Sequence, residues 1–310
     1  MRTLICGSMA YDTIMVFKDR FKNHILSEKI HILNVSFLVP EMRREFGGCA
    51  GNIAYNLKLL GGEPVIMATV GDDFGQYAER LGRYGIGTGH IRHIPGSYTA
   101  QAFITTDLDD NQITAFHPGA MNHAHENRVS DARDIQLGIV APDGRQGMID
   151  HACQFFEAGI PFIFDPGQGL PMFNGDELRQ FIRQADYVTC NDYEAQLLQE
   201  RTGESLAGLA RQVKALIVTL GAQGSQIHAD GQVHAIPPAR PSAVIDPTGC
   251  GDAYRAGLMF GMLKGMDWPT TGRLAGLLGA LKIASQGGQN HTFGYDEIAQ
   301  RFKAEYGYAW

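Results

Sequence analysis

Residues 246–257 read Asp-Pro-Thr-Gly-Cys-Gly-Asp-Ala-Tyr-Arg-Ala-Gly, and the rest of the chain can be organised around them. Turn-forming residues lead into Gly249, Cys250 and Gly251, and a helix with an apolar face is predicted over 253–263. The two glycines therefore lie where loop becomes helix. Free backbone N–H groups and the positive end of the helix dipole meet there, and glycine lets the backbone approach a ligand closely. The stretch suits an anion such as a phosphate.

Asp252 closes this segment and places a carboxylate inside the candidate anion site. Electrostatics alone would disfavour a carboxylate there, but it suits a general base that takes the proton from a hydroxyl attacking a phosphoryl group. A plain turn followed by an Asp that the helix dipole stabilises explains the same residues. The stretch by itself leaves both interpretations open.

The composition is typical of a globular protein. The chain has 310 residues, of which 44% are hydrophobic and 19% charged, so it can bury a sizeable core. A net charge of −7 argues against nucleic-acid binding. No apolar run approaches ~18 residues, so neither a membrane span nor a signal peptide is expected. The cysteines are odd in number, at five, and lack metal-site spacing, which favours reduced thiols in the cytoplasm.

The order of the predicted elements indicates an α/β fold. Strands alternate with helical stretches, which favours a mostly parallel sheet covered on both faces, with ligands at the carboxyl ends of the strands. The predicted strands of this sheet cover residues 2–8, 65–70, 136–140, 162–165, 187–190, 216–219, 225–229 and 233–236. The last two flank Asp230-Gly231 and form a hairpin.

A second, smaller sheet is predicted outside the main one. Residues 11–17 and 29–39 carry β-forming residues without helical spacing, and 100–106 and 113–116 flank a turn at 109–111 that suits a hairpin. We interpret these segments as insertions, at about 11–45 and 98–118, into one domain that spans residues 1–310.

Several further segments carry candidate binding residues. Residues 46–52 form a glycine-rich loop that opens a helix to about Leu60, and Asn52 offers an amide that both donates and accepts. Asn191 and Glu194 follow a strand and share one face of a helical turn, although a capping Asn with an exposed Glu fits the same spacing.

Other site types are excluded or disfavoured. The chain has no Gly-x-x-x-x-Gly-Lys-Ser/Thr segment, which excludes a P-loop, and no Gly-x-Gly-x-x-Gly after the first strand. His123 and His125 have no carboxylate or cysteine partner at ligand spacing, so solvated loop histidines are favoured. Phe103 and Phe116 fit a core role, but their place on the hairpin leaves them open as stacking surfaces.

The stretch 246–252 closely resembles the carboxy-terminal signature of the ribokinase-like (PfkB) carbohydrate and nucleoside kinases, with Cys250 where that family usually has Ala. Five more segments resemble the bacterial-type adenosine kinases within it, and the similarity extends from about residue 4 to about residue 306. These segments are 7–12, 36–39, 116–121, 165–168 and 191–194.

The resemblance implies a three-layer α/β/α fold with a small inserted β-sheet lid, and it implies roles for individual residues. Gly249, Cys250 and Gly251 would form the anion hole and Asp252 would be the catalytic base. The nucleoside would be held by its ribose and its base through Ser8, Asp12, Gly48, Asn52, Phe103, Phe116 and Gln168, with the two phenylalanines sandwiching the base. The nucleotide would contact Asn191, Thr219, Gly221, Gly224 and Gly251. Glu194 and Asn191 would organise Mg²⁺, which prefers hard oxygen ligands.

The sequence thus predicts an ATP- and Mg²⁺-dependent adenosine kinase of purine salvage that phosphorylates the 5′-hydroxyl of adenosine. The protein is expected to be a cytoplasmic monomer or homodimer without nucleic-acid or membrane partners. A monovalent cation is a further cofactor that the resemblance allows. A kinase of another nucleoside or of a ribose-type sugar is the alternative, and a nucleoside-binding sensor without turnover belongs to another class. An intact Asp252, together with Gly249 and Gly251, argues against the sensor.

Cys250 carries a separate prediction. A thiol at a helix amino terminus should have a lowered pKa, be partly thiolate near neutral pH and react fastest of the five cysteines with alkylating agents. The alternative is a small apolar filler, buried and inert.

Overall fold

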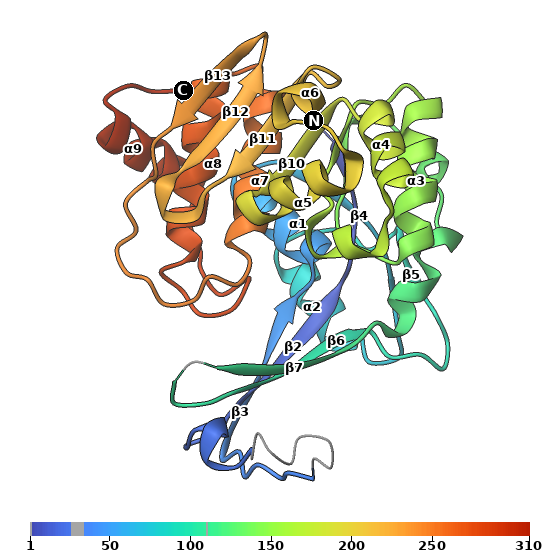
Figure 1. The fold of residues 1–310 in the computed structure, drawn as a ribbon, viewed down its shortest axis with the longest axis vertical. Helices are drawn as coiled ribbons and strands as arrows, with labels where there is room; N and C mark the ends of the chain where they lie inside the picture. The colour runs from blue at the N-terminus through green and yellow to red at the C-terminus, as the bar shows by residue number, and fades with distance from the viewer. Residues whose placement is uncertain (1, 26–33, 110) are drawn as a thin grey trace.

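The protein is described here by a computed structural model, which covers residues 2–25, 34–109 and 111–310. A large twisted sheet carries helices on both faces, and a smaller sheet projects from one end of the molecule (Figure 1). The predicted α/β class, with a mostly parallel main sheet and a small second sheet, is confirmed.

The main sheet has nine strands in the order β13-β12-β11-β10-β9-β8-β1-β4-β5. All pairs from β11 to β5 are parallel, and only the β11–β12 and β12–β13 pairs are antiparallel. The strands are β1 (Arg2–Cys6), β4 (Glu63–Val70), β5 (Ile91–His93), β8 (Ile135–Val140), β9 (Phe162–Phe164), β10 (Tyr187–Asn191), β11 (Ala215–Thr219), β12 (Ser225–Ala229) and β13 (Gln232–Ile236). Only the short β5 is missing from the sequence prediction.

Two apolar layers pack against the two faces of this sheet. In β1, Ile5 packs into one layer while Leu4 and Cys6 pack into the other, as a strand buried on both faces requires. The first layer is closed by α1 (Cys49–Leu59), α2 (Gly75–Arg83), α7 (Cys250–Leu263), α8 (Trp268–Lys282) and α9 (Tyr295–Tyr306). The second is closed by α3 (Arg145–Glu157), α4 (Gly175–Gln184), α5 (Asp192–Thr202) and α6 (Leu206–Ala210).

The second sheet has four strands in the order β3-β2-β6-β7. They are β2 (Ala10–Val16), β3 (Glu41–Gly47), β6 (Ala100–Thr106) and β7 (Gln112–His117). The predicted hairpin is therefore confirmed.

The strand predicted over 29–39 is wrong where it can be compared. Residues 34–39 have no regular structure, and residues 29–33 lie outside the described residues. The partner of β2 is instead β3, whose sequence Glu-Met-Arg-Arg-Glu-Phe-Gly is rich in charge. Its residues become a strand because β2 offers a free edge, a tertiary cause that strand propensity does not report.

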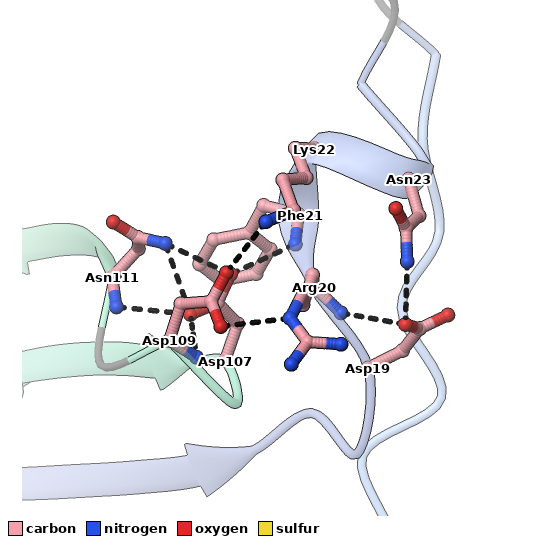
Figure 2. Close-up of polar contacts among 8 residues, drawn as sticks. All are labelled: Asp19, Arg20, Phe21, Lys22, Asn23, Asp107, Asp109 and Asn111. Atoms are coloured by element: carbon pink, nitrogen blue, oxygen red, sulfur yellow. Dashed lines mark hydrogen bonds and ion pairs between the residues drawn. The ribbon is translucent and has the colours of Figure 1, made fainter.

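The tip of the second sheet is tied together by Asp107 (Figure 2). Its buried carboxylate accepts hydrogen bonds from the main-chain N–H groups of Phe21, Asp109 and Asn111, at 2.9 Å each. Arg20 and Lys22 pair with Asp109 at 2.7 and 3.0 Å. The short 3₁₀ helix η1 (Phe21–Asn23) is thus fastened to the β6–β7 turn.

No helix among the described residues combines the length and apolar character needed to cross a membrane.

Candidate active site

Helix α7 begins at Cys250, and Gly249 precedes its first turn. Gly249 has φ of +78°, a left-handed conformation that favours glycine, and a Cβ added there would lie 3.1 Å from Gly288 Cα. The Cys250 N–H already donates to a carbonyl of the preceding turn, at 3.1 Å. Among the described residues, the N–H groups of Gly251 and Asp252 have no main-chain acceptor, so these two are available to an anion.

Asp252 lies in the first turn of α7 and is half-buried. Its Oδ2 accepts a hydrogen bond from Asn52 Nδ2 at 2.8 Å. Burial raises the pKa of Asp252 to about 6, against the hydrogen bond from Asn52 and the charge of Arg255, which lower it. At neutral pH this carboxylate is ionised but close to its pKa, as suits a proton acceptor.

Asn52 is held in one orientation by a chain of hydrogen bonds. Gln289 Nε2 donates to Asn52 Oδ1 at 3.1 Å and to the Tyr77 hydroxyl, which itself donates to the Gly47 carbonyl at 2.8 Å. Because Oδ1 accepts from Gln289, the Asn52 amide nitrogen faces Asp252. Gln289 and Tyr77 carried no role in the sequence prediction, since nothing local to them indicates this contact.

Asp12 lies on β2 and faces the same region. Burial, and after it the negative charges of Asp252, Asp246 and Glu45, raise the pKa of Asp12 to about 6. A Cβ on Gly47 would lie 2.4 Å from Asp12 Oδ2, so only glycine leaves room for this carboxylate.

Ser8 and Gly48 meet at the start of α1. The buried Ser8 hydroxyl accepts a hydrogen bond from the Cys49 N–H at 3.2 Å. Gly48 has φ of +86°, and a Cβ there would lie 2.5 Å from the Ser8 carbonyl oxygen. The structure therefore brings Ser8, Gly48, Asn52 and Asp252 together, as the sequence prediction grouped them.

Phe103 and Phe116 do not share a face of the second sheet. Phe116 pairs with Ala102, which pairs with Asp12, so these three side chains point to one side. Phe103 is the next residue after Ala102 and points to the other side. Both rings are exposed, at 53% for Phe116 and 39% for Phe103. The predicted sandwich is corrected accordingly: within one chain the two rings cannot cover one base, and only Phe116 faces the Asp12 side.

Gln168 lies on the 3₁₀ helix η5 (Gly167–Met172), beyond the carboxyl end of β9. It is exposed, and its side-chain amide makes no hydrogen bond with the other described residues. Its side-chain amide is thus available to a ligand. No protein contact fixes the orientation of this amide among the described residues.

Asn191 and Glu194 form a reciprocal capping box at the start of α5. The Asn191 side chain accepts from the Glu194 N–H, and the Glu194 carboxylate accepts from the Asn191 N–H, both at 2.7 Å. The capping alternative is therefore present, although Glu194 is half-buried rather than exposed. Burial raises the pKa of Glu194. Among the described residues, its second oxygen has no hydrogen-bond partner.

The glycine segment 219–224 follows β11, beside the end of β10. The Thr219 hydroxyl donates to the Cys190 carbonyl at 3.4 Å. Gly221 and Gly224 have φ of +56° and +89°, and a Cβ on Gly224 would lie 2.1 Å from the Ile236 carbonyl oxygen. These glycines form a tight turn around the 3₁₀ helix η6 (Gly221–Gln223) between two strands.

The lowered pKa predicted for the Cys250 thiol is wrong, whereas its rate of alkylation relative to the other cysteines stays a prediction. Burial raises the pKa of the Cys250 thiol to about 11, and Asp246 and Asp252 add to this, while only Lys282 lowers it. The helix amino terminus does not overcome desolvation, so the thiol is protonated at neutral pH.

A buried ion pair beside Asp252 was missed. Arg255 on α7 binds both oxygens of Asp165, at 2.7 and 2.9 Å, and both side chains are buried. Arg255 also donates to the Gly251 carbonyl at 3.2 Å. An arginine on the apolar face of a predicted helix was the signal in the sequence. Among the described residues, no cluster of three or more His, Cys, Asp or Glu side chains could hold a metal ion.

Comparison with known proteins gives one consistent result. The family model of the pfkB family carbohydrate kinases matches residues 12–292. A nucleoside kinase from Methanocaldococcus jannaschii is 30% identical over 279 residues, which cover 89% of this chain and 91% of that protein.

Solved structures agree with the family match. The nucleoside kinase of Burkholderia thailandensis in complex with inosine is 54% identical, covers 99% of both chains and has a TM-score of 0.91. The same enzyme in complex with ADP-inosine covers 99% of this chain and 97% of its own, with a TM-score of 0.89. A ribokinase from Thermotoga maritima, at 19% identity and a TM-score of 0.80, covers 98% of this chain and 99% of its own and shares the fold.

Proposed function

The chain belongs to the pfkB family of carbohydrate kinases, and we propose that it transfers the γ-phosphoryl group of ATP to the 5′-hydroxyl of a nucleoside, with adenosine as the substrate. The observation that carries the proposal is the first turn of α7. A carboxylate with a pKa of about 6 stands there beside two N–H groups without main-chain acceptors among the described residues.

In this reaction Asp252 takes the proton from the 5′-hydroxyl. The hydroxyl oxygen forms a bond to the γ-phosphorus while the bond to the bridging oxygen breaks, giving AMP and ADP, the products of a purine-salvage kinase. The N–H groups of Gly251 and Asp252 stabilise the negative charge of the transferred group. The bond from Asn52 keeps Asp252 oriented toward the hydroxyl.

The ribose hydroxyls are held by Asp12, Asn52 and Ser8, with the Gly48 backbone beside them. A carboxylate accepts from two vicinal hydroxyls, and an amide both donates and accepts. Phe116 offers one stacking surface for the base on the Asp12 side of the second sheet.

The nucleotide is held by the glycine segment with Thr219, Gly221 and Gly224, and by Asn191. Glu194 keeps one carboxylate oxygen outside the capping box, so it fits a water-mediated or direct contact to Mg²⁺. Bound Mg²⁺ would neutralise phosphate charge during transfer.

Glu194→Gln is expected to raise the Mg²⁺ concentration needed for half-maximal rate. An unchanged Mg²⁺ titration would mean that Glu194 only caps α5.

We assign the second sheet the role of a lid, built from the insertions at about 11–45 and 98–118 into a single domain. It carries Asp12 on β2 and Phe116 on β7. Figure 1 shows this sheet projecting from one end of the molecule. Closing it over the nucleoside would exclude water and limit ATP hydrolysis.

Inosine is the second candidate substrate, because the 54%-identical B. thailandensis enzyme was solved with it. Gln168 does not distinguish the two bases, since its amide can accept from the 6-amino group of adenine or donate to the 6-oxo group of hypoxanthine.

The test is a panel of adenosine, inosine, guanosine, cytidine and ribose with ATP and Mg²⁺, scored by release of ADP. We expect kcat/KM to be highest for adenosine, and a higher value for inosine would select the second candidate. Preference for ribose over every nucleoside, or no turnover of any, would overturn the proposed function.

A further inference from the structure

Lys282 is a fully buried lysine that the proposed reaction does not use. It is the last residue of α8 and is 0% exposed. Lysine is almost never buried to this degree without partners. Its Nζ donates to the carbonyl oxygens of Asp246 and Ser285, at 2.7 and 2.9 Å.

These two acceptors belong to different loops. Asp246 lies in the loop 237–249 that leads into α7, and Ser285 lies in the loop that leaves α8. The main-chain N–H groups of Ile245 and Asp246 also donate to the Ile283 carbonyl, at 2.8 and 3.1 Å. The loop before α7 is therefore docked on the carboxyl end of α8, where the helix dipole favours a positive charge.

Asp246 extends the same connection toward the anion site. Its Oδ1 accepts from the Thr248 N–H at 2.9 Å, and its Oδ2 accepts from the Gly287 N–H at 2.8 Å. The following residue, Gly288, is the one that packs against Gly249. The ammonium of Lys282 and the carboxylate of Asp246 thus hold together the two loops that shape the start of α7.

Main-chain carbonyl oxygens that converge on one point are how proteins hold a monovalent cation. Here the two converging oxygens already face an ammonium group. A metal ion could take them only by displacing Lys282 from a site that is closed to solvent. The monovalent cation that the family resemblance allows therefore does not fit this place.

We propose that Lys282 is a built-in monovalent cation, a positioning residue whose ammonium fixes the two loops around the anion site and removes the need for a bound monovalent metal ion there. The proposal deepens the proposed function and rests on it for its catalytic part.

The charges around Lys282 are consistent with this role. Burial lowers the pKa of Lys282, but the negative charges of Asp246 and Glu45 act in the opposite direction and favour the ammonium form. The charge of Lys282 in turn lowers the pKa of Cys250, so the ammonium acts on the first turn of α7.

Two substitutions of Lys282 distinguish the effect of its ammonium charge from that of its side-chain volume. Lys282→Ala removes the ammonium and leaves a space that a small cation can enter, whereas Lys282→Met fills the space with an apolar chain. Lys303→Met, at an exposed position on α9, controls for loss of a charge. Each variant and the native protein are assayed in tetramethylammonium, sodium, potassium and ammonium chloride at constant ionic strength.

We expect the native protein and Lys303→Met to turn over within about twofold in all four salts. In tetramethylammonium chloride, kcat of both Lys282 variants should fall roughly 10–100-fold, as for a misplaced reacting group. Potassium or ammonium should restore much of kcat in Lys282→Ala but not in Lys282→Met. A native rate that depends several-fold on potassium, an unimpaired Lys282→Ala, or a loss that no cation restores would overturn the proposal.

Thermal unfolding supplies a readout that needs no kinase activity. Potassium or ammonium should raise the melting temperature of Lys282→Ala by roughly 2–4 °C over tetramethylammonium, because a ligand that binds the folded state stabilises it, and should leave the native protein unchanged. A shift in the native protein, or none in Lys282→Ala, counts against the built-in cation. If no nucleoside were phosphorylated, this result would still stand, so the two proposals fail separately.

Discussion

At the residue scale, the proposed chemistry depends on two carboxylates, Asp12 and Asp252, whose pKa values lie well above that of an ordinary Asp. Asp12 and Asp252 both reach about 6, in each case first through burial, and the charge of Asp252 also acts on Asp12. One is placed on the lid sheet and the other on α7, and only Asp252 receives the hydrogen bond from Asn52. The raised pKa values make both residues sensitive to mild acid, whereas an ordinary Asp is ionised down to about pH 4.

Asp252→Asn should leave the fold and nucleoside binding intact but lower kcat roughly 10²–10⁴-fold, because the amide cannot accept the hydroxyl proton. The measurements are kcat with ATP and adenosine, and adenosine affinity by calorimetry. Asp192→Asn, an exposed residue in the first turn of α5, serves as the control. Turnover of Asp252→Asn within a few-fold of native would remove the residue from the base role.

The pH dependence should follow the raised pKa of Asp252. A carboxyl group with a pKa of about 6 becomes protonated as the pH falls through 6, so kcat at saturating nucleoside should decline there and not near 4. Protonation of Asp12 over the same range should appear in KM, since Asp12 is proposed to hold the ribose of the substrate. A flat kcat between pH 7 and 5 would contradict the assignment.

At the scale of elements, the hairpin β6–β7 decides which side chains can reach a substrate. Alternation along a strand places neighbouring residues on opposite faces, so a single step in register separates Phe116 from Phe103. The outer end of the same hairpin is fastened to η1 by Asp107 and Asp109, as Figure 2 shows. Strand register therefore determines which side chains of the second sheet face the Asp12 side. The contacts of Asp107 and Asp109 hold the tip of the sheet.

Phe116→Ala should lower kcat/KM for adenosine roughly 5–150-fold, because one base–aromatic stack contributes ~1–3 kcal/mol. Its effect on ribose phosphorylation should be small. Phe103→Ala is the matched control, an exposed phenylalanine of the same hairpin on the opposite face. If Phe103→Ala lowered kcat/KM for adenosine as much as Phe116→Ala, the side of the sheet on which a ring lies would not determine whether it stacks on the base.

Asp107→Ala should release η1 from the hairpin. Burial alone would raise the pKa of Asp107. Hydrogen bonds from Phe21, Asn111 and Asp109 outweigh burial and bring this pKa below its ordinary value, so they stabilise the charged carboxylate. The amide hydrogens of Phe21 and Asn111 should exchange faster with solvent, while that of Ala253 in α7 should not change. The exposed Asp296→Ala is the control. Unchanged exchange at Phe21 would mean that packing alone holds the tip.

On the scale of the whole molecule, the site is assembled from segments that end at one edge of the main sheet. The Arg255–Asp165 pair joins α7 to the end of β9 inside that edge, and the Asn52–Asp252 bond joins α1 to α7. These contacts link the parts of the chain that we propose hold the nucleoside to those that we propose hold the anion.

Arg255→Met should destabilise the protein by ~3–5 kcal/mol, because it leaves Asp165 buried without its partner. Adding Asp165→Asn should recover part of that loss, since it removes the unpaired charge. Urea unfolding of the single and double variants measures both values. If the double variant were no more stable than Arg255→Met, the buried charge would not be the cause.

Local patterns in the sequence determined most strands of the main sheet, the two hairpins and the glycine segments that open α1 and α7, but not β3 or β5. Each of these depends on neighbours within one or two turns, which is the range over which side-chain periodicity and glycine act. The grouping of Ser8, Gly48, Asn52 and Asp252 followed from family resemblance.

The tertiary structure decided the rest, because burial and pairing depend on residues far apart in the chain. Asn52 and Asp252 are 200 residues apart, and Gln289, which orients Asn52, lies 237 residues from it. The protonated Cys250 thiol followed from desolvation that outweighs a helix terminus, which no local pattern reports. Lys282 reads in the sequence as an ordinary lysine at the end of a helix, and only the fold closes it between two carbonyl oxygens.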